Sequence, residues 1–439
     1  MSSSTAKKLR PQSRHPDEYA HTLSLAETGQ PVDRDPHSYE RWLITKLLRM
    51  SGSPPIAFRL WNDDVVTPDT GYPKYTVSVK DPKALFSLVT NPNLAFGDLY
   101  SAGRLEVDND LPALMADLYR SIHRAREDWP KWLEALWRNH PPRSTSLEDA
   151  RDNIHHHYDL GNNFYRLWLD RAEMQYTCAY YERPDLTLEQ AQLAKLEHVC
   201  RKLRLRPGQT VVEAGCGWGG LARYMARHHG VRVMAYNISR EQIVYARAEA
   251  RRQGLEDRIE YIEDDYRNIS GQFDAFVSIG MLEHVGKDHY PQLAELIQRC
   301  LKPHGLALLH SIGRNRPMLM NAWIEKRIFP GAYPPSIGEF LSICESGHFS
   351  VLDVENLRLH YAQTLTHWLE RFEQHRVDIS AMYDERFTRA WRLYLAGSIA
   401  AFDVGSLQLF QVLFTHADNH QLPQSRCDIY QSPAAPEDY

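Results

Sequence analysis

Several side chains that can take up or release a proton stand where the chain is expected to leave a β-strand. Glu283 and His284 follow one apolar run, and His310 ends the next one. Tyr361 follows a third apolar run, and Cys178 lies in a cluster of tyrosines. A carboxyl group, an imidazole, a thiol and a phenol at one place could hold a small anion or move a proton during a reaction. These residues are therefore the first candidates for a catalytic site.

A glycine-rich turn links the first apolar run to a predicted helix. Residues 210–220 read Thr-Val-Val-Glu-Ala-Gly-Cys-Gly-Trp-Gly-Gly, and apolar residues then recur at helical spacing. A strand, a tight loop and a helix start in this order open the ligand crevice of a parallel α/β sheet. Gly215 and Gly217 permit a sharp turn and the close approach of a ligand. Taken alone, such a loop could also be a structural turn.

Further apolar runs predict the rest of this sheet. The predicted strands cover residues 231–238, 259–262, 273–279, 306–309, 349–357 and 407–414, and the predicted helices cover 188–203, 336–346, 365–376 and 379–402. Residues 317–335 are irregular and rich in aromatic side chains, as expected of a cap over a substrate. Polar groups gather after successive strands, where open α/β sheets bind their ligands.

Four segments together resemble the motifs of a known enzyme family. Glu-Ala-Gly-Cys-Gly-Trp-Gly-Gly at 213–220 resembles motif I of S-adenosylmethionine-dependent methyltransferases. With Gln-Tyr-Thr-Cys-Ala-Tyr at 175–180, Gly-Met-Leu-Glu-His-Val-Gly at 280–286 and Leu-Leu-His-Ser-Ile-Gly at 308–313, it resembles the cyclopropane fatty acid synthases and their mycolic-acid relatives. The resemblance runs from about residue 94 to about residue 414. It implies an α/β fold of class I, with a Rossmann-like seven-stranded sheet and a smaller N-terminal α+β domain.

The resemblance also implies two bound groups, S-adenosylmethionine and bicarbonate, and the residues that hold them. Around the bicarbonate, which serves as the base, the matching catalytic residues are Cys178, Glu283, His310, Ile312 and Tyr361. Glu283 and His310 would orient the ion, Cys178 and Tyr361 would hydrogen-bond to it, and Ile312 would offer its backbone. The residues matching the cofactor site are Tyr176, Thr177, Glu213, Ala214, Gly215, Cys216, Gly217, Trp218, Gly219, Asn237, Ile238, Ser239, Gln242, Tyr266 and Arg267.

Three positions depart from the family pattern. The family usually has Asp where this chain has Glu213, and it commonly has Thr at Asn237. Some relatives carry a cysteine in a late helix, where the matching residue here is Ser398. We expect Glu213 to keep the role of the shorter acid, because its charge is the same. We assign no catalytic role to Ser398.

The chemistry implied by the resemblance makes specific demands on the site. An isolated alkene is a weak nucleophile, and its attack on a sulfonium methyl leaves a carbocation. Ring closure then requires a base beside the delivered methyl, and water must be excluded because it would trap the cation. The expected activity is therefore that of a cyclopropane-fatty-acyl-phospholipid synthase, which adds a methylene from S-adenosylmethionine across a cis double bond of a phospholipid acyl chain.

Other functions remain open at this stage. The same cation could lead to a methyl-branched or methylene-bearing chain, so a fatty-acyl C-methyltransferase is the nearest alternative. A lipid-carrying protein with an inactive site and a small-molecule or protein methyltransferase are the others. A dinucleotide-binding site is disfavoured, because the loop reads G-C-G-W-G-G rather than G-x-G-x-x-G and position 237 is Asn rather than an acid.

Each candidate residue also has an ordinary structural interpretation. Cys178 could be a small buried apolar residue, His310 a strand-end histidine with structural partners, and Tyr361 one of 23 tyrosines. Glu213 could be an ordinary acid at the end of a strand. The three adjacent histidines at 155–157 invite a metal hypothesis, but adjacent side chains do not converge on one ion, so we expect no metal site.

Composition sets the wider limits. The 439 residues carry a net charge of −5, so nothing indicates a nucleic-acid surface. Six cysteines show no C-x-x-C pair, which suits a reducing cytoplasm. No apolar run approaches the ~20 residues of a membrane-spanning helix. We therefore expect a cytoplasmic enzyme that associates peripherally with the inner leaflet and acts on unsaturated phospholipid acyl chains; a homodimer is expected from the resemblance only.

The domain organisation follows from composition and turn signals. We expect a disordered tail at 1–38, an accessory lipid-handling domain at 39–142, the catalytic domain at 143–420 and a C-terminal tail at 421–439. Within the accessory domain, Trp129, Trp132 and Trp137 fall on one face of a predicted helix. This stripe favours packing within the domain over a membrane contact, because such stripes are usually core.

Overall fold

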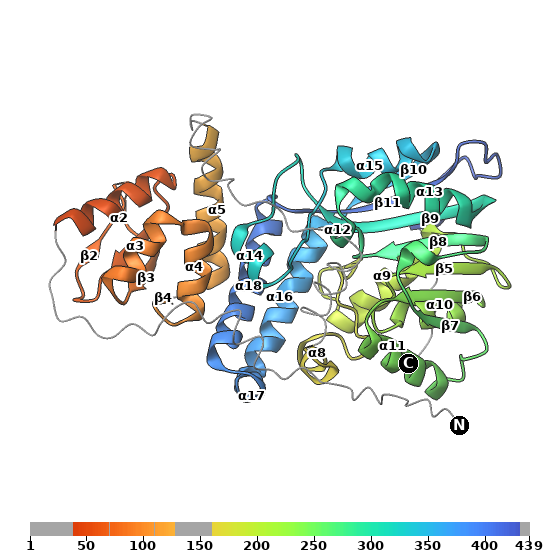
Figure 1. Ribbon diagram of the computed structural model, residues 1–439, viewed down its shortest axis with the longest axis horizontal. Helices are drawn as coiled ribbons and strands as arrows, with labels where there is room; N and C mark the ends of the chain where they lie inside the picture. Colours follow the sequence, from red (N-terminus) through yellow and green to blue (C-terminus); the bar gives the residue numbers. More distant parts are fainter. Residues whose placement is uncertain (1–37, 70, 109, 128–159, 431–439) are drawn as a thin grey trace, which may run out of the picture.

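The computed structural model describes residues 38–69, 71–108, 110–127 and 160–430 (Figure 1). A small N-terminal domain lies at one end and a large α/β domain at the other, with long helices from the C-terminal half between them. The tryptophan stripe and the three histidines at 155–157 lie outside the described residues. The expected tail at 1–38 lies outside them too, except for Ser38.

Within the described residues, the N-terminal domain combines four helices with a four-stranded sheet. The helices are α2 (Ser38–Met50), α3 (Pro82–Thr90), α4 (Pro92–Ser101) and α5 (Leu111–Glu127), and the strands are β1 (Ile56–Arg59), β2 (Val65–Val66), β3 (Tyr75–Val79) and β4 (Leu105–Asp108). The strand order is β2-β1-β3-β4. Asp81 begins α3 by accepting the Ala84 N–H at 2.9 Å, and Pro82 suits the first turn. The sequence predicts helices at 39–50, 81–89 and 110–124 and strands at 56–61 and 75–80, which correspond to α2, α3, α5, β1 and β3.

The large domain is built on a seven-stranded sheet, as expected. Its strands are β5 (Thr210–Ala214), β6 (Arg232–Asn237), β7 (Ile259–Glu263), β8 (Phe273–Ile279), β9 (Leu301–Gly313), β10 (Phe349–Asn356) and β11 (Gln408–His416). The order is β10-β11-β9-β8-β5-β6-β7. Strand β11 runs antiparallel to both β9 and β10, whereas the other pairs are parallel. The carboxyl ends of β5, β6, β8 and β9 therefore meet along one edge.

Alternating side chains bury both faces of this sheet. Val211 packs with one helical layer and Val212 with the opposite one, because successive side chains of a strand point to opposite faces. On the first face lie α9 (Leu188–Lys202), α10 (Gly220–His228) and α11 (Arg240–Arg252); on the second lie α13 (Tyr290–Cys300) and α15 (Ile337–Ser346). Short elements at the strand ends are η1 (Tyr266–Asn268), α12 (Leu282–Val285) and η2 (Lys287–His289).

The helices between the domains differ from the sequence expectation. They are α8 (Asn162–Trp168), α14 (Ala322–Arg327), α16 (Arg358–Gln374), α17 (Arg376–Met382) and α18 (Glu385–Asp403). Helix α16 begins seven residues before the predicted start at 365, so Tyr361 lies on a helix rather than on a loop after a strand. Its first turn is partly polar, which hid the helical period. The segment at 317–335, which was expected to be irregular, contains α14, and several of its residues line the cavity described below.

The C-terminal segment is more ordered than expected. Residues Cys427–Tyr430 form the short helix α19, and Ile429 is fully buried. Arg426 Nη1 lies 2.7 Å from Asp353 Oδ1, which lies in β10. The predicted tail at 421–439 is thus wrong for residues up to Tyr430, because these contacts anchor that segment to the catalytic domain.

The two domains share a packed and charged contact. A Cβ atom on Gly97 of α4 would stand 2.4 Å from the Trp323 ring of α14, so only glycine permits this approach. Beside it, Arg327 Nη2 lies 2.9 Å from Asp98 Oδ2. Arg389 Nε donates to the Tyr100 carbonyl at 2.7 Å. Helices α14 and α18 are thereby fixed against the N-terminal domain.

A buried charge cluster joins α9 to β10. Glu355 Oε2 lies 2.7 Å from His198 Nε2 and 2.6 Å from Lys202 Nζ, and Lys202 also pairs with Asp353. Burial opposes ionisation of Glu355, but the hydrogen bond from His198 and the charge of Lys202 outweigh it and lower its pKa to about 2. The Tyr180 ring stacks on His198 with centroids 4.2 Å apart.

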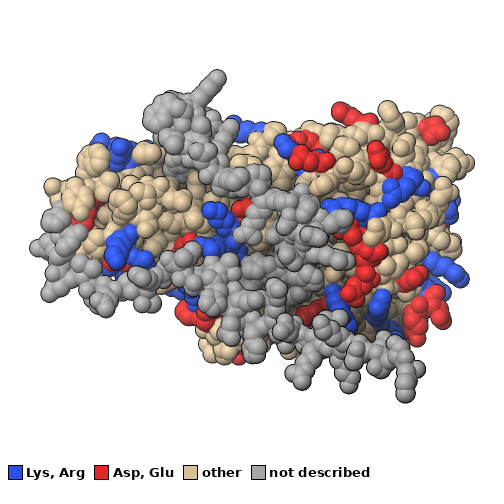
Figure 2. All heavy atoms as spheres, viewed as in Figure 1, with Lys and Arg blue, Asp and Glu red and all other residues tan. Residues whose placement is uncertain are grey.

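Three properties concern membrane-spanning helices, surface charge and free thiols. Within the described ranges, no helix is both long and apolar enough to cross a bilayer. Acidic and basic side chains are interspersed over the face of the large domain drawn in Figure 2. All six cysteines are free thiols, and five of them are buried.

Candidate active site

The glycine loop after β5 lies where the sequence predicts the ligand crevice, and its glycines leave the backbone without side chains. Gly215, Gly217 and Gly219 have φ values of 85°, 52° and 78°, which favour glycine. The N–H groups of Gly215 and Cys216 both donate to the Tyr236 carbonyl, at 2.9 and 3.0 Å. The loop is thereby tied to β6 and held open toward the sheet edge.

Glu213 lies at the end of β5, beside this loop. Its side chain is buried, and Oε2 has no hydrogen-bond partner among the described residues. Burial raises its pKa to about 7, although the charges of Lys195 and Arg223 act in the opposite direction. A buried carboxylate oxygen that lacks a partner is suited to a cationic or hydrogen-bonding group of a ligand.

The end of β6 adds a polar network. Asn237 Nδ2 donates to the Gly217 carbonyl at 3.2 Å and to Gln242 Oε1 at 2.8 Å. The Ser239 N–H donates to Asn237 Oδ1 at 3.2 Å, and Gln242 Nε2 has no partner within the part of the chain that the structure describes. Asn237 therefore ties the second strand end to the glycine loop.

The remaining predicted cofactor residues lie at or just after the ends of β5, β6 and β7. Ala214 is buried in β5, Ile238 follows β6, and Cys216 and Trp218 are buried in the loop. The Trp218 indole N–H donates to Asn162 Oδ1 at 2.7 Å. Arg267 lies over the Tyr266 ring, with its guanidinium carbon 5.3 Å from the ring centroid. Tyr266 thus offers an aromatic face at the third strand end.

Residues 175–178, called here the strap, run along the crevice from the N-terminal side. The Tyr176 and Tyr394 hydroxyls lie 3.0 Å apart. Thr177 is held from α9, because Lys195 Nζ donates to Thr177 Oγ1 at 2.9 Å and Gln192 Nε2 donates to its carbonyl at 2.8 Å. A Cβ atom on Gly280 would lie 3.1 Å from the Thr177 methyl, so the strap touches the end of β8.

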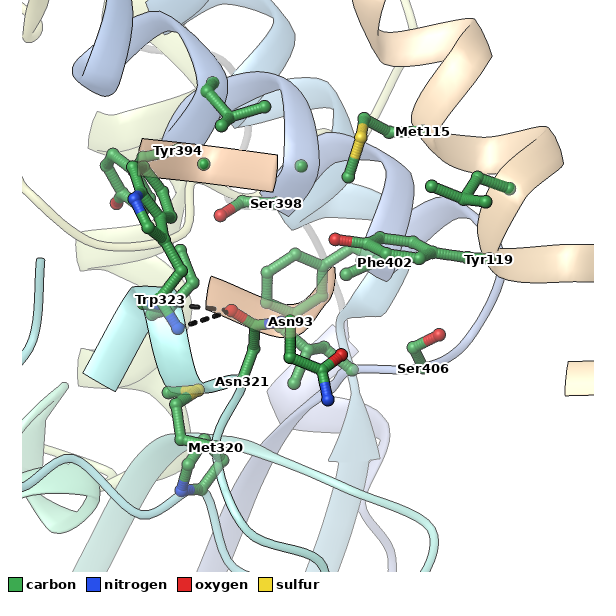
Figure 3. A pocket seen from close by; sticks show the side chains of 18 of the residues that line it. Asn93, Met115, Tyr119, Met320, Asn321, Trp323, Tyr394, Ser398, Phe402 and Ser406 are labelled. Carbon is green, nitrogen blue, oxygen red and sulfur yellow. Dashed lines mark hydrogen bonds between the residues drawn. The ribbon is translucent and has the colours of Figure 1, made fainter. Parts of the chain in front are cut away.

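A cavity of about 380 Å³ connects the strap with both domains. One end is lined by the five predicted bicarbonate residues together with Tyr176 and Thr177. The other end reaches apolar side chains of the N-terminal domain. In Figure 3, Met115 and Tyr119 of α5 point toward Ser398 and Phe402 of α18, across the seam between the domains. The cavity therefore joins a small polar end to a long apolar one.

Glu283 is the acid at the polar end. Its side chain is buried on α12, and Oε1 accepts the Ile312 N–H at 2.6 Å. The second oxygen, Oε2, has no hydrogen-bond partner in the described residues. Burial raises the pKa of Glu283 to about 7, and the hydrogen bond from Ile312 moderates this rise. One oxygen is thus fixed by the backbone and the other is left for a ligand.

His310 lies across the same end of the cavity, on β9. Burial lowers its pKa to about 3, and the charges of Lys195 and Lys202 lower it further, so the imidazole is neutral at pH 7. Its Nδ1 lies 3.0 Å from Gln411 Nε2, whereas Nε2 has no partner in the described residues. The amide of Gln411 fixes the ring and leaves Nε2 for a bound group.

Cys178 and Tyr361 complete the polar end. The Cys178 thiol is fully buried and donates to the Ala179 carbonyl at 3.1 Å. Burial raises its pKa well above the usual value, so it stays a neutral thiol. The Tyr361 ring packs against Phe402, with centroids 4.6 Å apart. Both groups can act as hydrogen-bond donors to an anion.

Ile312 differs from the expectation in one respect. The resemblance implied that its backbone would hold the anion, but the N–H is bound to Glu283. Its carbonyl accepts the Ser311 hydroxyl at 2.9 Å, and its side chain lines the cavity. Ile312 therefore orients Glu283 in this structure rather than presenting a free backbone donor.

Sequence reasoning missed three polar residues that support the site. Gln411 faces His310 because the antiparallel pairing of β9 with β11 places the two residues opposite each other. Lys195 and Gln192 lie on the buried face of α9, where a helical pattern predicts apolar residues. That mismatch between a charged residue and a buried helical position was the one available signal for Lys195.

The site as a whole fits S-adenosylmethionine. The glycine floor, the unpartnered oxygen of Glu213 and the free amide of Gln242 suit a ligand with charged and hydroxyl groups. The crevice opens at the carboxyl ends of parallel strands, and the strap leads from it to the Glu283 pocket. The fold and the site define a class I S-adenosylmethionine-dependent methyltransferase.

Comparison with known proteins gives the family. Residues 145–412 match the family model described as mycolic acid cyclopropane synthetase. Residues 43–127 match a domain of unknown function. This chain belongs to the family of mycolic acid cyclopropane synthetases.

Individual relatives agree with this placement. The chain is 42% identical over 355 residues to the cyclopropane-fatty-acyl-phospholipid synthase of Escherichia coli, covering 80% of this chain and 90% of that protein. It is 38% identical over 395 residues to a probable fatty acid methyltransferase of Pseudomonas putida, covering 86% and 96%. A mycolic acid cyclopropane synthase solved with SAH and CTAB superposes with a TM-score of 0.57 and 30% identity, covering 60% of this chain and 97% of that one.

Proposed function

We propose that the protein is a cyclopropane-fatty-acyl-phospholipid synthase. It adds a methylene unit from S-adenosylmethionine across a cis double bond of a phospholipid acyl chain, with bicarbonate as the base. The observation that carries the proposal is one continuous cavity. It joins the polar cluster around Glu283 to apolar side chains of the N-terminal domain. The named activities of the E. coli and P. putida relatives support an acyl-lipid substrate.

The chain's own residues would contribute in three ways. The apolar wall holds the alkene against the strap and keeps water from the cation. The bound cofactor supplies an electrophilic methyl group, and the alkene takes it while the C–S electron pair stays on sulfur. Tyr361 and the ring packed on it, Phe402, present aromatic groups near the resulting cation.

Ring closure requires loss of one proton from the delivered methyl, whose C–H electron pair then closes the ring. Bound bicarbonate would supply the base for this proton. Glu283 Oε2 and His310 Nε2 are the unpartnered buried atoms that would orient the ion, and both lie at the polar end of the cavity. Cys178 and Tyr361 would add hydrogen bonds as neutral donors. The four side chains thus set the base beside the methyl that it deprotonates.

Lipid mass spectrometry tests the proposal directly. The purified chain is incubated with isotopically labelled S-adenosylmethionine and vesicles of unsaturated phospholipid. We expect acyl chains that gain one labelled CH₂ unit and lose the double bond. Unchanged acyl chains, with bicarbonate present, would exclude the proposed activity.

The second candidate is a fatty-acyl methyltransferase that makes a branched or methylene-bearing chain. The relative from P. putida and the tuberculostearic acid methyltransferase of Mycobacterium tuberculosis, which is 32% identical over 339 residues, favour it. The same incubation separates the two reactions. Both products carry the label. The methylene product keeps a double bond that can be reduced, whereas the cyclopropane product has no double bond.

We also propose that the protein meets the bilayer through the outer end of its N-terminal domain. Trp42 on α2 and Phe86 on α3 are 58% and 64% exposed, and Lys46 Nζ lies 5.1 Å from the centroid of the Trp42 ring. The neighbouring residues Leu47 and Leu88 of the same helices line the apolar end of the cavity. An acyl chain could pass from the bilayer into the cavity between these helices.

Vesicle sedimentation tests this surface. Replacing Trp42 and Phe86 by alanine should weaken sedimentation with anionic phospholipid vesicles about tenfold, because two exposed aromatic rings are removed. The matched control is Val377→Ala on α17, which removes an exposed apolar side chain far along the sequence and should have no effect. Equal sedimentation of the double variant and the control would exclude this docking surface.

A further inference from the structure

Lys195 is a buried cation next to the strap, and the reaction described above does not use it. Its side chain is completely buried on α9, and Nζ donates to Gln175 Oε1 at 2.5 Å and to Thr177 Oγ1 at 2.9 Å. No ion pair joins it to a carboxylate in the described part of the chain. Burying a charge with only neutral partners is costly, and a glutamine or methionine would avoid that cost. The charge itself therefore calls for an explanation.

The groups around Lys195 place it behind the cofactor crevice. Asp170 and Cys178 face it from the segment that contains the strap, Glu213 from β5, and His310 from β9. Burial lowers the pKa of Lys195 to about 8. The negative charge of Asp170 opposes this by raising the pKa, and Glu213 raises it by a smaller amount. The ammonium is thus one hydrogen bond away from Thr177, which lines the cavity together with Glu283.

We propose that Lys195 is a positioning residue that holds the strap and whose buried positive charge weakens binding of the cofactor's sulfonium relative to its neutral thioether product. The inference rests on the cofactor assignment and not on which acyl product is formed. Like charges in a poorly hydrated site repel, and the repulsion disappears when the sulfonium becomes a thioether. Loss of this repulsion favours methyl departure, because the repulsion is present in the reactant complex and absent once the thioether has formed.

The sign of the pH dependence follows from this arrangement. As the pH rises through about 8, Lys195 loses its proton and the sulfonium is no longer repelled, so the affinity for S-adenosylmethionine rises relative to that for S-adenosylhomocysteine. Conversely, binding of the sulfonium drives a proton off Lys195. The two ligands share their other ionisable groups, so the ligands' own titrations cancel in the ratio of affinities. Among the protein's groups, Glu213 and Glu283 also have pKa values of about 7, so measurements above pH 8, where both are largely ionised, isolate Lys195.

Calorimetry of the full-length chain tests the inference without an activity assay. The two ligands are titrated between pH 7.5 and pH 9.5 in buffers of different ionisation enthalpy. We expect S-adenosylmethionine to release more protons than S-adenosylhomocysteine near pH 8.5. The ratio of the two affinities should rise about tenfold, the order expected when a repulsion between like unit charges in a poorly hydrated site is removed.

Two variants give matched controls. Lys195→Arg keeps the charge at every pH used, so its ratio should stay flat at the low value. Lys195→Gln removes the charge, so its ratio should stay flat at the high value. A wild-type ratio that does not change above pH 8, or that changes equally in Lys195→Arg, overturns the inference even if a variant fails to fold. Binding of neither ligand by the wild type would overturn the cofactor assignment as well, whereas missing cyclopropane product alone would affect only the proposed function.

Discussion

Replacing Glu283 by glutamine should make the protein more stable and nearly inactive. The Ile312 N–H requires an acceptor at the Oε1 position, 2.6 Å away. The glutamine carbonyl must therefore occupy this position, and the amide NH₂ is forced to the position of Oε2. The variant keeps the backbone hydrogen bond but presents a donor where the wild type presents a carboxylate oxygen.

The stability gain can be worked from the pKa. Burial raises the pKa of Glu283 from 4.5 to about 7, so ionising this group in the folded protein above that range costs up to about 3 kcal/mol relative to the unfolded chain. A neutral amide escapes this cost. Urea unfolding at pH 8 should show the variant more stable by an amount up to this value, and the difference should vanish below about pH 4.5.

Turnover should change in the opposite direction. Loss of the group that we propose orients the base should lower product formation by about a hundredfold or more, while S-adenosylhomocysteine binding is unchanged. Glu283→Ala is the comparison, because it also removes the acceptor for the Ile312 N–H and leaves a buried donor unsatisfied, which costs ~1–3 kcal/mol. A glutamine variant within about threefold of wild-type turnover, or one that unfolds more easily at pH 8, would refute the reasoning.

Three further predictions concern packing, the cavity and acid stability. Gly97→Ala should lower the free energy of unfolding by about 2 kcal/mol, because the new methyl group would meet the Trp323 ring. Gly338→Ala, on α15 with no atom nearby, should raise the free energy of unfolding by about 0.5–1 kcal/mol. Thermal melts compare the two variants. Ser398→Phe should fill the cavity and lower product formation at least about tenfold with S-adenosylhomocysteine affinity unchanged, as calorimetry would show. Glu355 has a lowered pKa of about 2, so its contribution to stability is present above pH 4.5 and is lost as the pH falls toward 2; Glu355→Gln should remove about 2 kcal/mol of this acid sensitivity in urea titrations.

The central sheet was accessible from sequence because its parallel strands are buried on both faces and read as short apolar runs. The antiparallel strand β11 and the glycine loop after β5 were found for the same local reasons. The first two turns of α16 were missed because their outer face is polar. In addition, the helix follows β10 after a single residue, so no loop separates the two elements. The strands β2 and β4 are too short to show a period.

The site divides in the same way. Glu283 and His310 follow apolar runs, so their common edge could be inferred from the parallel sheet. The partner of His310 could not, because Gln411 meets it only through the register of two strands about a hundred residues apart. The bond between Glu283 and the Ile312 N–H depends on the position of α12 above β9. Contacts set by tertiary register leave no trace in local spacing.

The largely apolar lining of the cavity has a consequence for selectivity. Hydrocarbon side chains offer nearly the same contacts to a saturated chain as to an unsaturated one, since dispersion forces scarcely distinguish them. Under the proposed function, saturated phospholipids should therefore occupy the same space and act as competitive inhibitors, with a negative heat-capacity change on association. Discrimination between lipids would then arise at the reacting carbon rather than during uptake, and the membrane's own saturated fraction would set the pace of its modification.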